Sequence, residues 1–127
     1  MESPYAPGDF INCLFPFGER PDRPGPALHV VYCERLFIGT RGRPSVAAFY
    51  TTTVLRPRDE PKRPWIIEVS EDNARKMGMQ KAFAIDTRRI GFMPIARDFF
   101  PDLDRPDRGI RGRATQHLQD VLDRKWF

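Results

Sequence analysis

Thirteen prolines and nine glycines are spread along the whole chain without a repeating interval. Both residue types interrupt regular structure, so their distribution favours short strands joined by irregular loops over a helical bundle. The apolar share of 40%, with ten Phe and two Trp, supplies enough surface for one hydrophobic core. We therefore expect a single domain that spans residues 1–127.

Side-chain alternation and β-branched or aromatic content predict five or six short strands. Ile11, Cys13 and Phe15 share one face of the first strand. The predicted strands cover residues 9–15, 27–33, 45–53, 65–69, 82–86 and 89–93. Polar, Pro-rich segments at 17–26 and 55–64, a turn at 40–44 and residues 99–113 are expected to be loops. Such a strand count favours a small barrel or a highly curved sheet.

Two helices complete the expected fold. Ser70 is a helix N-cap, acidic residues follow it, and Gly78 ends the segment after a basic turn. From Thr115 onward, apolar residues recur at helical spacing, which predicts a C-terminal amphipathic helix. Its apolar positions are Leu118, Val121, Leu122, Trp126 and Phe127. The predicted class is mainly β with helices (α+β).

The charge favours a polyanionic partner. The formal net charge is +4, and 17 of the 21 basic residues are Arg, whose planar guanidinium matches phosphate oxygens and stacks on bases. The codon bias of a GC-rich genome accounts for the Arg excess equally well. Both explanations stay open at this point.

Neither a membrane segment nor a metal centre is expected. No apolar run approaches the roughly 20 residues that cross a bilayer, and the start lacks the features of a signal peptide, so a cytoplasmic protein is predicted. Cys13 and Cys33 lack a Cys-x-x-Cys arrangement and nearby His pairs. We interpret both as reduced, buried thiols.

Several short motifs follow one another in a fixed order along the chain. They are Gly8-Asp9-Phe10-Ile11, the Pro/Arg-rich loop, Pro26-Ala27-Leu28-His29-Val30-Val31, Tyr50-Thr51-Thr52-Thr53, Gly78, Asp86 with basic residues after it, and Gly112-Arg113. Taken in this order, they resemble the motifs of the PemK/MazF family of toxin endoribonucleases. The resemblance implies an SH3-like barrel of the PemK/MazF/CcdB type with a C-terminal helix. It also implies a homodimer with a groove for single-stranded RNA across the subunit interface, and a cognate antitoxin that carries an acidic C-terminal segment.

The implied reaction needs no metal or other cofactor. The 2′-hydroxyl attacks the adjacent phosphate and leaves a 2′,3′-cyclic phosphate and a 5′-hydroxyl. In relatives, the working pair is an Arg directly before Pro-Ala-Leu and a Thr at the end of the third strand. Thr51 matches the Thr, whereas Gly25 occupies the Arg position, so Arg23 becomes the catalytic candidate, with Arg20 as the second. Glu19 resembles the family's acidic loop residue, with a role in loop ordering or as general base.

Further residues are candidates for gripping RNA. These RNA-binding candidates are Arg20, Thr52, Thr53, Arg56, Arg58, Arg88 and Arg89. Ordinary surface charge, loop ion pairs of Arg20 and Arg23 with neighbouring acids, and β-branched residues that finish an edge strand are the structural alternatives.

A non-catalytic binding module, for RNA or protein, is the alternative function, and Gly25 favours it. A CcdB-like gyrase inhibitor is a variant of this alternative, because such toxins use the chain's end, where Trp126 and Phe127 stand. We expect His29 and His117 to be structural. For Trp65, Phe99 and Phe100 we expect core packing more than base stacking.

Overall fold

Alternating side chains along the strands build two hydrophobic cores, one on each face of a sheet. The computed structural model describes residues 3–18 and 20–125. In β1 (Asp9–Cys13), Ile11 and Cys13 enter one core, as predicted for a shared face. The strand ends two residues earlier than predicted, because the Leu14 N–H donates to the Phe99 carbonyl, and Phe15 joins the same core from beyond the strand. Phe10, which precedes Ile11 in β1, enters the other core.

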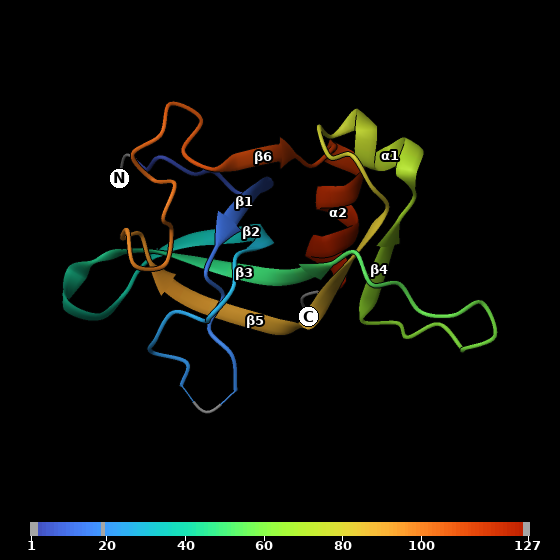
Figure 1. Cartoon of the computed structure of the whole chain (residues 1–127), viewed down its shortest axis with the longest axis horizontal. Coiled ribbons are helices and arrows are strands. Elements are labelled where there is room, and N and C mark those ends of the chain that lie inside the picture. Colours follow the sequence, from blue (N-terminus) through green and yellow to red (C-terminus); the bar gives the residue numbers. More distant parts are fainter. Residues whose placement is uncertain (1–2, 19, 126–127) are drawn as a thin grey trace.

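Six antiparallel strands form one sheet in the order β4-β5-β3-β2-β1-β6 (Figure 1). The other elements are β2 (His29–Ile38), η1 (Thr40–Gly42), β3 (Pro44–Thr52), β4 (Ile66–Val69), α1 (Glu71–Lys76), β5 (Phe83–Pro94), β6 (Ile110–Arg113) and α2 (Gln116–Lys125). Within the described residues β4 and β6 are the edges of the sheet and are not paired with each other. The predicted class, mainly β with helices, is confirmed.

The predicted pair of strands at 82–86 and 89–93 is wrong, because β5 runs through both. Its pairing with β3 shifts between Phe49, opposite Ile90, and Tyr50, opposite Asp86. Residues 87–89 therefore bulge out of the β3 ladder. The polar stretch that suggested a gap between strands is this bulge, since Thr87 instead donates its N–H and Oγ1–H to the Trp65 carbonyl at 3.0 and 2.6 Å.

Two further boundaries differ from the prediction. β2 continues past Cys33 to Ile38. Its pairing with β3 shifts in register between Cys33 and Arg35, at the charged residue Glu34. The segment 99–113, expected to be loop, ends in β6, which pairs with β1. An ion pair of 2.9 Å between Arg113 and Asp9 joins these two strands. The two residues are more than 100 positions apart, so the local sequence around β6 does not reveal its partner strand.

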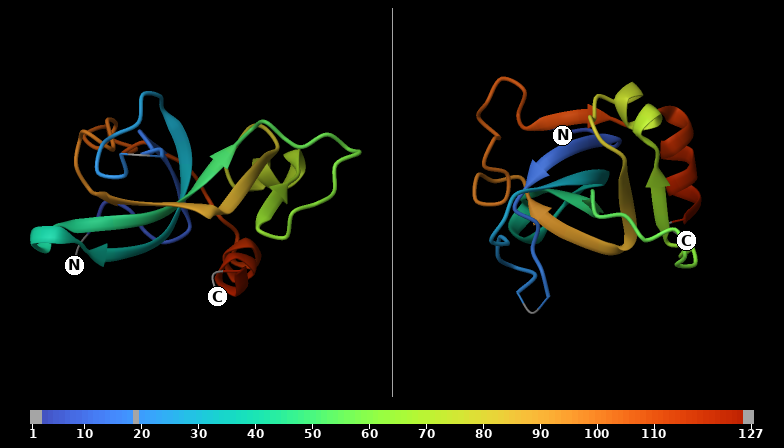
Figure 2. Two further views of the ribbon diagram at one scale, coloured as in Figure 1. Left: turned by 90° about the horizontal axis from the view of Figure 1, so that it is seen from below. Right: turned by 45° about the vertical axis from the view of Figure 1, so that its right-hand side comes forward.

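Both helices form where expected. Ser70 caps α1, and its Oγ accepts the Asn73 N–H at 3.3 Å. The α2 helix packs Leu118 and Leu122 into the core that contains Phe10. Trp126 and Phe127 lie outside the described residues. Seen from below, the β2–β3 hairpin projects away from the end of the molecule that carries β4 and α1 (Figure 2).

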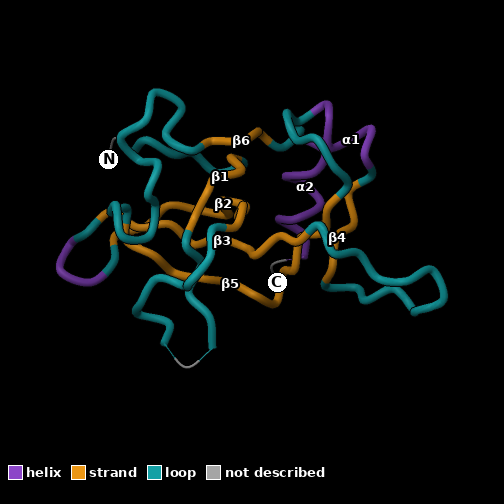
Figure 3. The backbone as a smooth tube through the Cα atoms, viewed as in Figure 1, coloured by secondary structure: helices purple, strands orange, loops and turns teal. Residues whose placement is uncertain are grey.

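The loops leave the sheet in different directions. Figure 3 shows the segments between β1 and β2, between β3 and β4 and between β5 and β6 extending from the sheet as loops. Across residues 3–18 and 20–125, no helix combines the length and apolar character that spanning a bilayer requires.

Candidate nucleic-acid interface

The end of β3 lies between two hollows in the surface. We call them the Arg89 hollow, of about 410 Å³, and the Thr51 hollow, of about 470 Å³. Tyr50, Thr52 and Val54 line both, so this short stretch is the wall between them. A third, the Arg23 hollow, measures about 570 Å³ and belongs to the β1–β2 segment. Its lining consists of Phe17, Arg20, Arg23, Pro24, Gly25 and Pro26.

Three aromatic rings connect the hollows. Phe17 of the Arg23 hollow meets His29 and Tyr50 with ring centroids 5.5 Å apart in each case. His29 and Tyr50, which line the Thr51 hollow, have centroids 5.1 Å apart, and His29 Nδ1 lies 3.4 Å from the Tyr50 hydroxyl. All three contacts are edge-on, the geometry that aromatic pairs favour. We call this group the Phe17–His29–Tyr50 cluster.

The bulge in β5 places two arginines on aromatic rings. The Arg88 guanidinium lies over Trp65, 3.7 Å from the ring centroid. Arg89 lies over Tyr50 at 4.9 Å and over Phe17 at 5.3 Å. Cation–π contact fixes each guanidinium plane while its outer N–H groups stay available. Trp65 itself is half-buried and belongs to neither core, whereas Phe99 and Phe100 are core residues, as predicted.

The hydroxyl of Thr51 is buried and hydrogen-bonded inside the protein. Its side chain is 6% exposed, and its Oγ1 donates to the Val30 carbonyl at 2.6 Å. Thr52, which points to the opposite face, accepts the Val54 N–H at 3.0 Å. Thr53 is exposed in the Thr51 hollow. The three hydroxyls therefore meet different surroundings, and Thr51 donates within the sheet.

Gly25 occupies a place where no side chain fits. Its N–H donates to the Leu14 carbonyl at 3.1 Å, and a Cβ would overlap the Phe15 carbonyl oxygen. The position directly before Pro26 is thus closed by backbone in this chain, and no Arg side chain fits there. Arg23 and Arg20 are exposed in the neighbouring hollow, not in the Thr51 hollow, and Glu19 lies outside the described residues.

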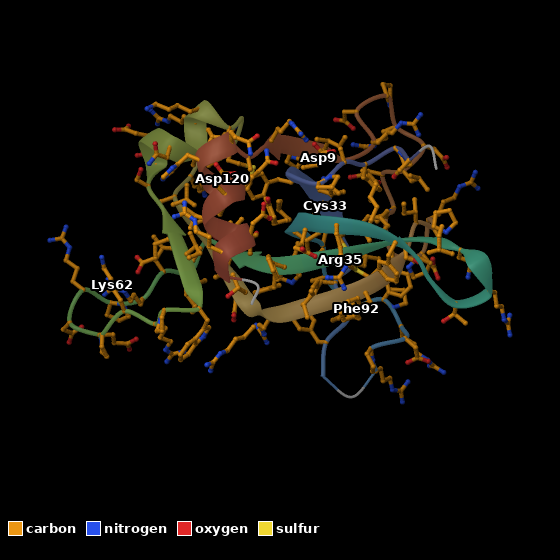
Figure 4. The ribbon with its side chains drawn as sticks, turned by 180° about the vertical axis from the view of Figure 1, so that it is seen from behind. Asp9, Cys33, Arg35, Lys62, Phe92 and Asp120 are labelled. Atoms are coloured by element: carbon orange, nitrogen blue, oxygen red, sulfur yellow. The ribbon has the colours of Figure 1, made fainter. Side chains whose placement is uncertain are left out.

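The β3–β4 segment uses one candidate arginine internally and exposes the other. Arg56 is paired with Glu68 at 2.7 Å and donates to the Glu60 carbonyl at 2.7 Å, so it holds the segment against β4. Arg58 is exposed. Figure 4 shows Lys62 in the projecting part of this segment, far from Arg35 and Phe92 on the sheet.

The hollows differ in charge. Lys81 and Arg111 line the Thr51 hollow, Arg20 and Arg23 line the Arg23 hollow, and no carboxylate among the described residues lines either. The Arg89 hollow carries both signs. Its charged residues are Arg56, Arg63, Arg89, Glu60, Glu68 and Asp86. Basic surface free of carboxylates suits phosphate, whereas mixed donors and acceptors suit the edge of a base.

The buried thiols do not supply a nucleophile. Both cysteines are free and buried, as predicted. Burial raises the pKa of the Cys33 thiol to about 12, and burial likewise raises the pKa of Cys13. The thiolate is the reactive form, so both groups stay inert at neutral pH.

Sequence reasoning missed the central members of this interface. The sequence predicts a loop position without a role for Phe17, shows Tyr50 only as part of a motif, and predicts a structural role for His29. The sequence feature that could have indicated this cluster is the pair of ring side chains, Phe17 and His29, on either side of the Pro-rich loop. Only the fold shows that the loop returns Phe17 onto His29.

No protein-family model matches the sequence, and no curated protein is significantly similar to it. Among the described residues, no three His, Cys, Asp or Glu side chains gather closely enough to hold a metal ion.

Proposed function

We propose that this protein is a toxin endoribonuclease of the PemK/MazF type, with an SH3-like barrel, that cuts single-stranded RNA in the cytoplasm. The observation that carries the proposal is the meeting of two basic hollows, in which the described lining residues include no carboxylate, and one hollow of mixed charge at the Phe17–His29–Tyr50 cluster. Single-stranded RNA needs basic surface for its backbone and flat rings for its bases.

The division of charge suggests how RNA lies across the interface. Phosphates fit the Thr51 and Arg23 hollows, whose basic lining residues are Lys81, Arg111, Arg20 and Arg23 and whose described lining includes no carboxylate. A base fits the Arg89 hollow, between the ring of Tyr50 and the charged groups around it. The scissile phosphate then lies near the end of β3.

The proposed chemistry is attack of a 2′-hydroxyl on its own phosphate without a metal ion. Cations around the Thr51 hollow would stabilise the charge that develops on the phosphorane. The proposal includes a homodimer, which light scattering tests through the mass in solution, and an antitoxin whose acidic segment covers the basic hollows.

Incubation of the purified protein with a long single-stranded RNA in EDTA tests the activity. Discrete cuts that carry 2′,3′-cyclic phosphate ends are the expected result. Activity that disappears in EDTA contradicts the metal-free mechanism, and absence of cutting in several varied RNAs by folded protein contradicts the enzyme.

A non-catalytic RNA-binding module is the second candidate. It is favoured by the closed position at Gly25 and by the Thr51 hydroxyl, which donates to Val30. This alternative predicts RNA binding that weakens as the salt concentration rises, with no cleavage. The same incubation, followed by a binding assay, therefore distinguishes the enzyme from the binding module.

A further inference from the structure

The proposed reaction needs a group that removes the proton of the attacking 2′-hydroxyl, a task that side chains near their ionisation point perform best. Neither Gly25 nor Thr51, the two positions that the resemblance assigns to catalysis, supplies such a group. Gly25 has no side chain and no room for one, and Thr51 uses its hydroxyl hydrogen on the Val30 carbonyl. The base must come from another side chain of the interface.

His29 stands at the required place. It is the first residue of β2, it is half-buried, and it lines the Thr51 hollow together with Thr51, Thr52 and Thr53. Imidazole is the one side chain whose ordinary pKa lies near neutrality. The other histidine, His117, is exposed on α2 and lines none of the three hollows.

Tyr50 and Phe17 fix the ring of His29. The Tyr50 hydroxyl lies 3.4 Å from Nδ1, and both aromatic rings pack edge-on against the imidazole. When Nδ1–H donates to the Tyr50 oxygen, the lone pair is on Nε2, the nitrogen that Tyr50 does not engage. An imidazole held in this tautomer and orientation can accept a proton at Nε2.

We propose that His29 is the general base of the cleavage reaction and that Tyr50 positions it. The inference rests on the proposed function. The 2′-hydroxyl gives its proton to Nε2 while the O2′–P bond forms and the P–O5′ bond breaks. The leaving 5′ oxygen takes a proton from water, and the imidazolium returns its proton to solvent, so the enzyme is unchanged after one turnover.

The charged groups that surround His29 suit this role. From β3 it faces the Tyr50 hydroxyl, and from β5 Arg89 lies over the same Tyr50 ring. Lys81 and Arg111 line the hollow with it, and Arg20 and Arg23 lie beyond Phe17. Cations at these places draw the phosphate toward the hollow and stabilise its extra charge in the transition state.

The test compares two histidine variants of the full chain on one single-stranded RNA in EDTA, with kcat and KM measured from pH 5 to pH 9. For His29→Gln we expect kcat to fall by about 10²- to 10⁴-fold, the range of general acid–base catalysis. We expect KM to stay within about threefold, because the base does not hold the ground state. His117→Gln is the matched control and keeps both constants.

The pH profile separates catalysis from structure. The rising limb of kcat in the wild type is expected to persist in His117→Gln and to disappear in His29→Gln. Tyr50→Phe keeps the ring and loses the hydroxyl, so kcat is expected to fall by about 10- to 100-fold with the limb retained, as for other positioning groups. An unchanged kcat and profile in His29→Gln overturns the inference while leaving the ribonuclease in place. No cleavage by the wild type refutes the proposed function, and the inference with it.

Chemical modification covers the case in which substitutions of His29 unfold the protein. In His117→Gln, diethylpyrocarbonate has a single histidine to modify. Inactivation that hydroxylamine reverses, and that an uncleavable RNA with a 2′-deoxy scissile site prevents, supports the role. Full activity after modification of His29 overturns it.

Discussion

Gly25 directly precedes the Pro26-Ala27-Leu28 segment that leads into β2, and its packing leaves no room for a side chain. Its N–H donates to Leu14, and a Cβ would overlap the Phe15 carbonyl oxygen. We expect Gly25→Ala to lower the free energy of unfolding by about 1–3 kcal/mol, as overpacking does elsewhere. Urea unfolding of the purified variant measures this.

Gly18→Ala in the same loop is the control for the Gly25 substitution. A Cβ there meets nothing within 4 Å, and the cost comes from a φ of +56° alone. That backbone strain amounts to about 1–2 kcal/mol. Wild-type stability in Gly25→Ala contradicts the closed position and reopens the site to an Arg.

Thr51 has a hydroxyl hydrogen with two competing acceptors, the Val30 carbonyl in the present structure and a phosphate oxygen in the proposed complex. Thr51→Val keeps the shape and removes the hydroxyl, so it is expected to cost about 0.5–1.5 kcal/mol of stability. RNA cleavage is expected to fall as well. Thr51→Ser restores the hydroxyl and both properties in large part.

The Thr51 variants separate two roles in one measurement series. Urea unfolding reports the bond to Val30, and cleavage rates at a temperature where all variants are folded report the contact with RNA. A loss of stability without a loss of cleavage assigns Thr51 to the sheet alone.

Among the elements, the β1–β2 segment carries Arg20 and Arg23, the basic side chains that line the Arg23 hollow. We expect Arg23→Ala to weaken RNA binding, to reduce cleavage and to leave stability unchanged. It should lower the slope of log K against log salt by about 0.7 if one phosphate contact is lost. Filter binding at several salt concentrations measures the slope.

Arg75→Ala on α1 removes the same charge from a residue that lines none of the three hollows, and it is the matched control. Arg75 is exposed and paired with Glu71 at 2.9 Å. Equal effects of the two substitutions indicate a response to net charge alone, and an unchanged Arg23→Ala moves the assignment to Arg20.

The elements themselves were largely predictable, because each depends on local patterning. Ser70 and Gly78 delimit α1, and alternation reveals β1 and β3. The single strand β5 was not predictable, because its bulge resembles a turn in sequence and is recognised only by its pairing with β3. β6 depends likewise on a distant partner, β1.

The candidate site was predictable only in outline. The sequence pointed to the hydroxyls after β3 and to loop arginines, and the fold brings them to adjoining hollows. The engagement of Thr51 with Val30, the closed position at Gly25 and the contact of His29 with Tyr50 join residues from different strands and loops. Such side-chain contacts depend on the tertiary structure, and no local sequence pattern predicts them.

At the scale of the whole molecule, the two cores bury groups that ionise in alkaline solution. Burial raises the pKa of Cys33 from 9.0 to about 12, and it raises the pKa values of Cys13, Tyr5 and Tyr32. Below pH 9 these groups keep their protons in both the folded and the unfolded chain. Above it, the unfolded chain releases protons that the folded chain retains.

Stability is therefore expected to fall as pH rises from 9 toward 12, by about 1.4 kcal/mol per pH unit for each group that ionises only on unfolding. Urea midpoints at half-unit steps from pH 7 to pH 11 measure the slope. Cys13→Ala lowers stability at every pH by leaving a cavity, but it has one proton fewer to release, so its slope above pH 9 is expected to be shallower. Equal midpoints at pH 8 and pH 10.5 contradict the buried, protonated thiols and phenols, and with them the two-sided packing of the sheet.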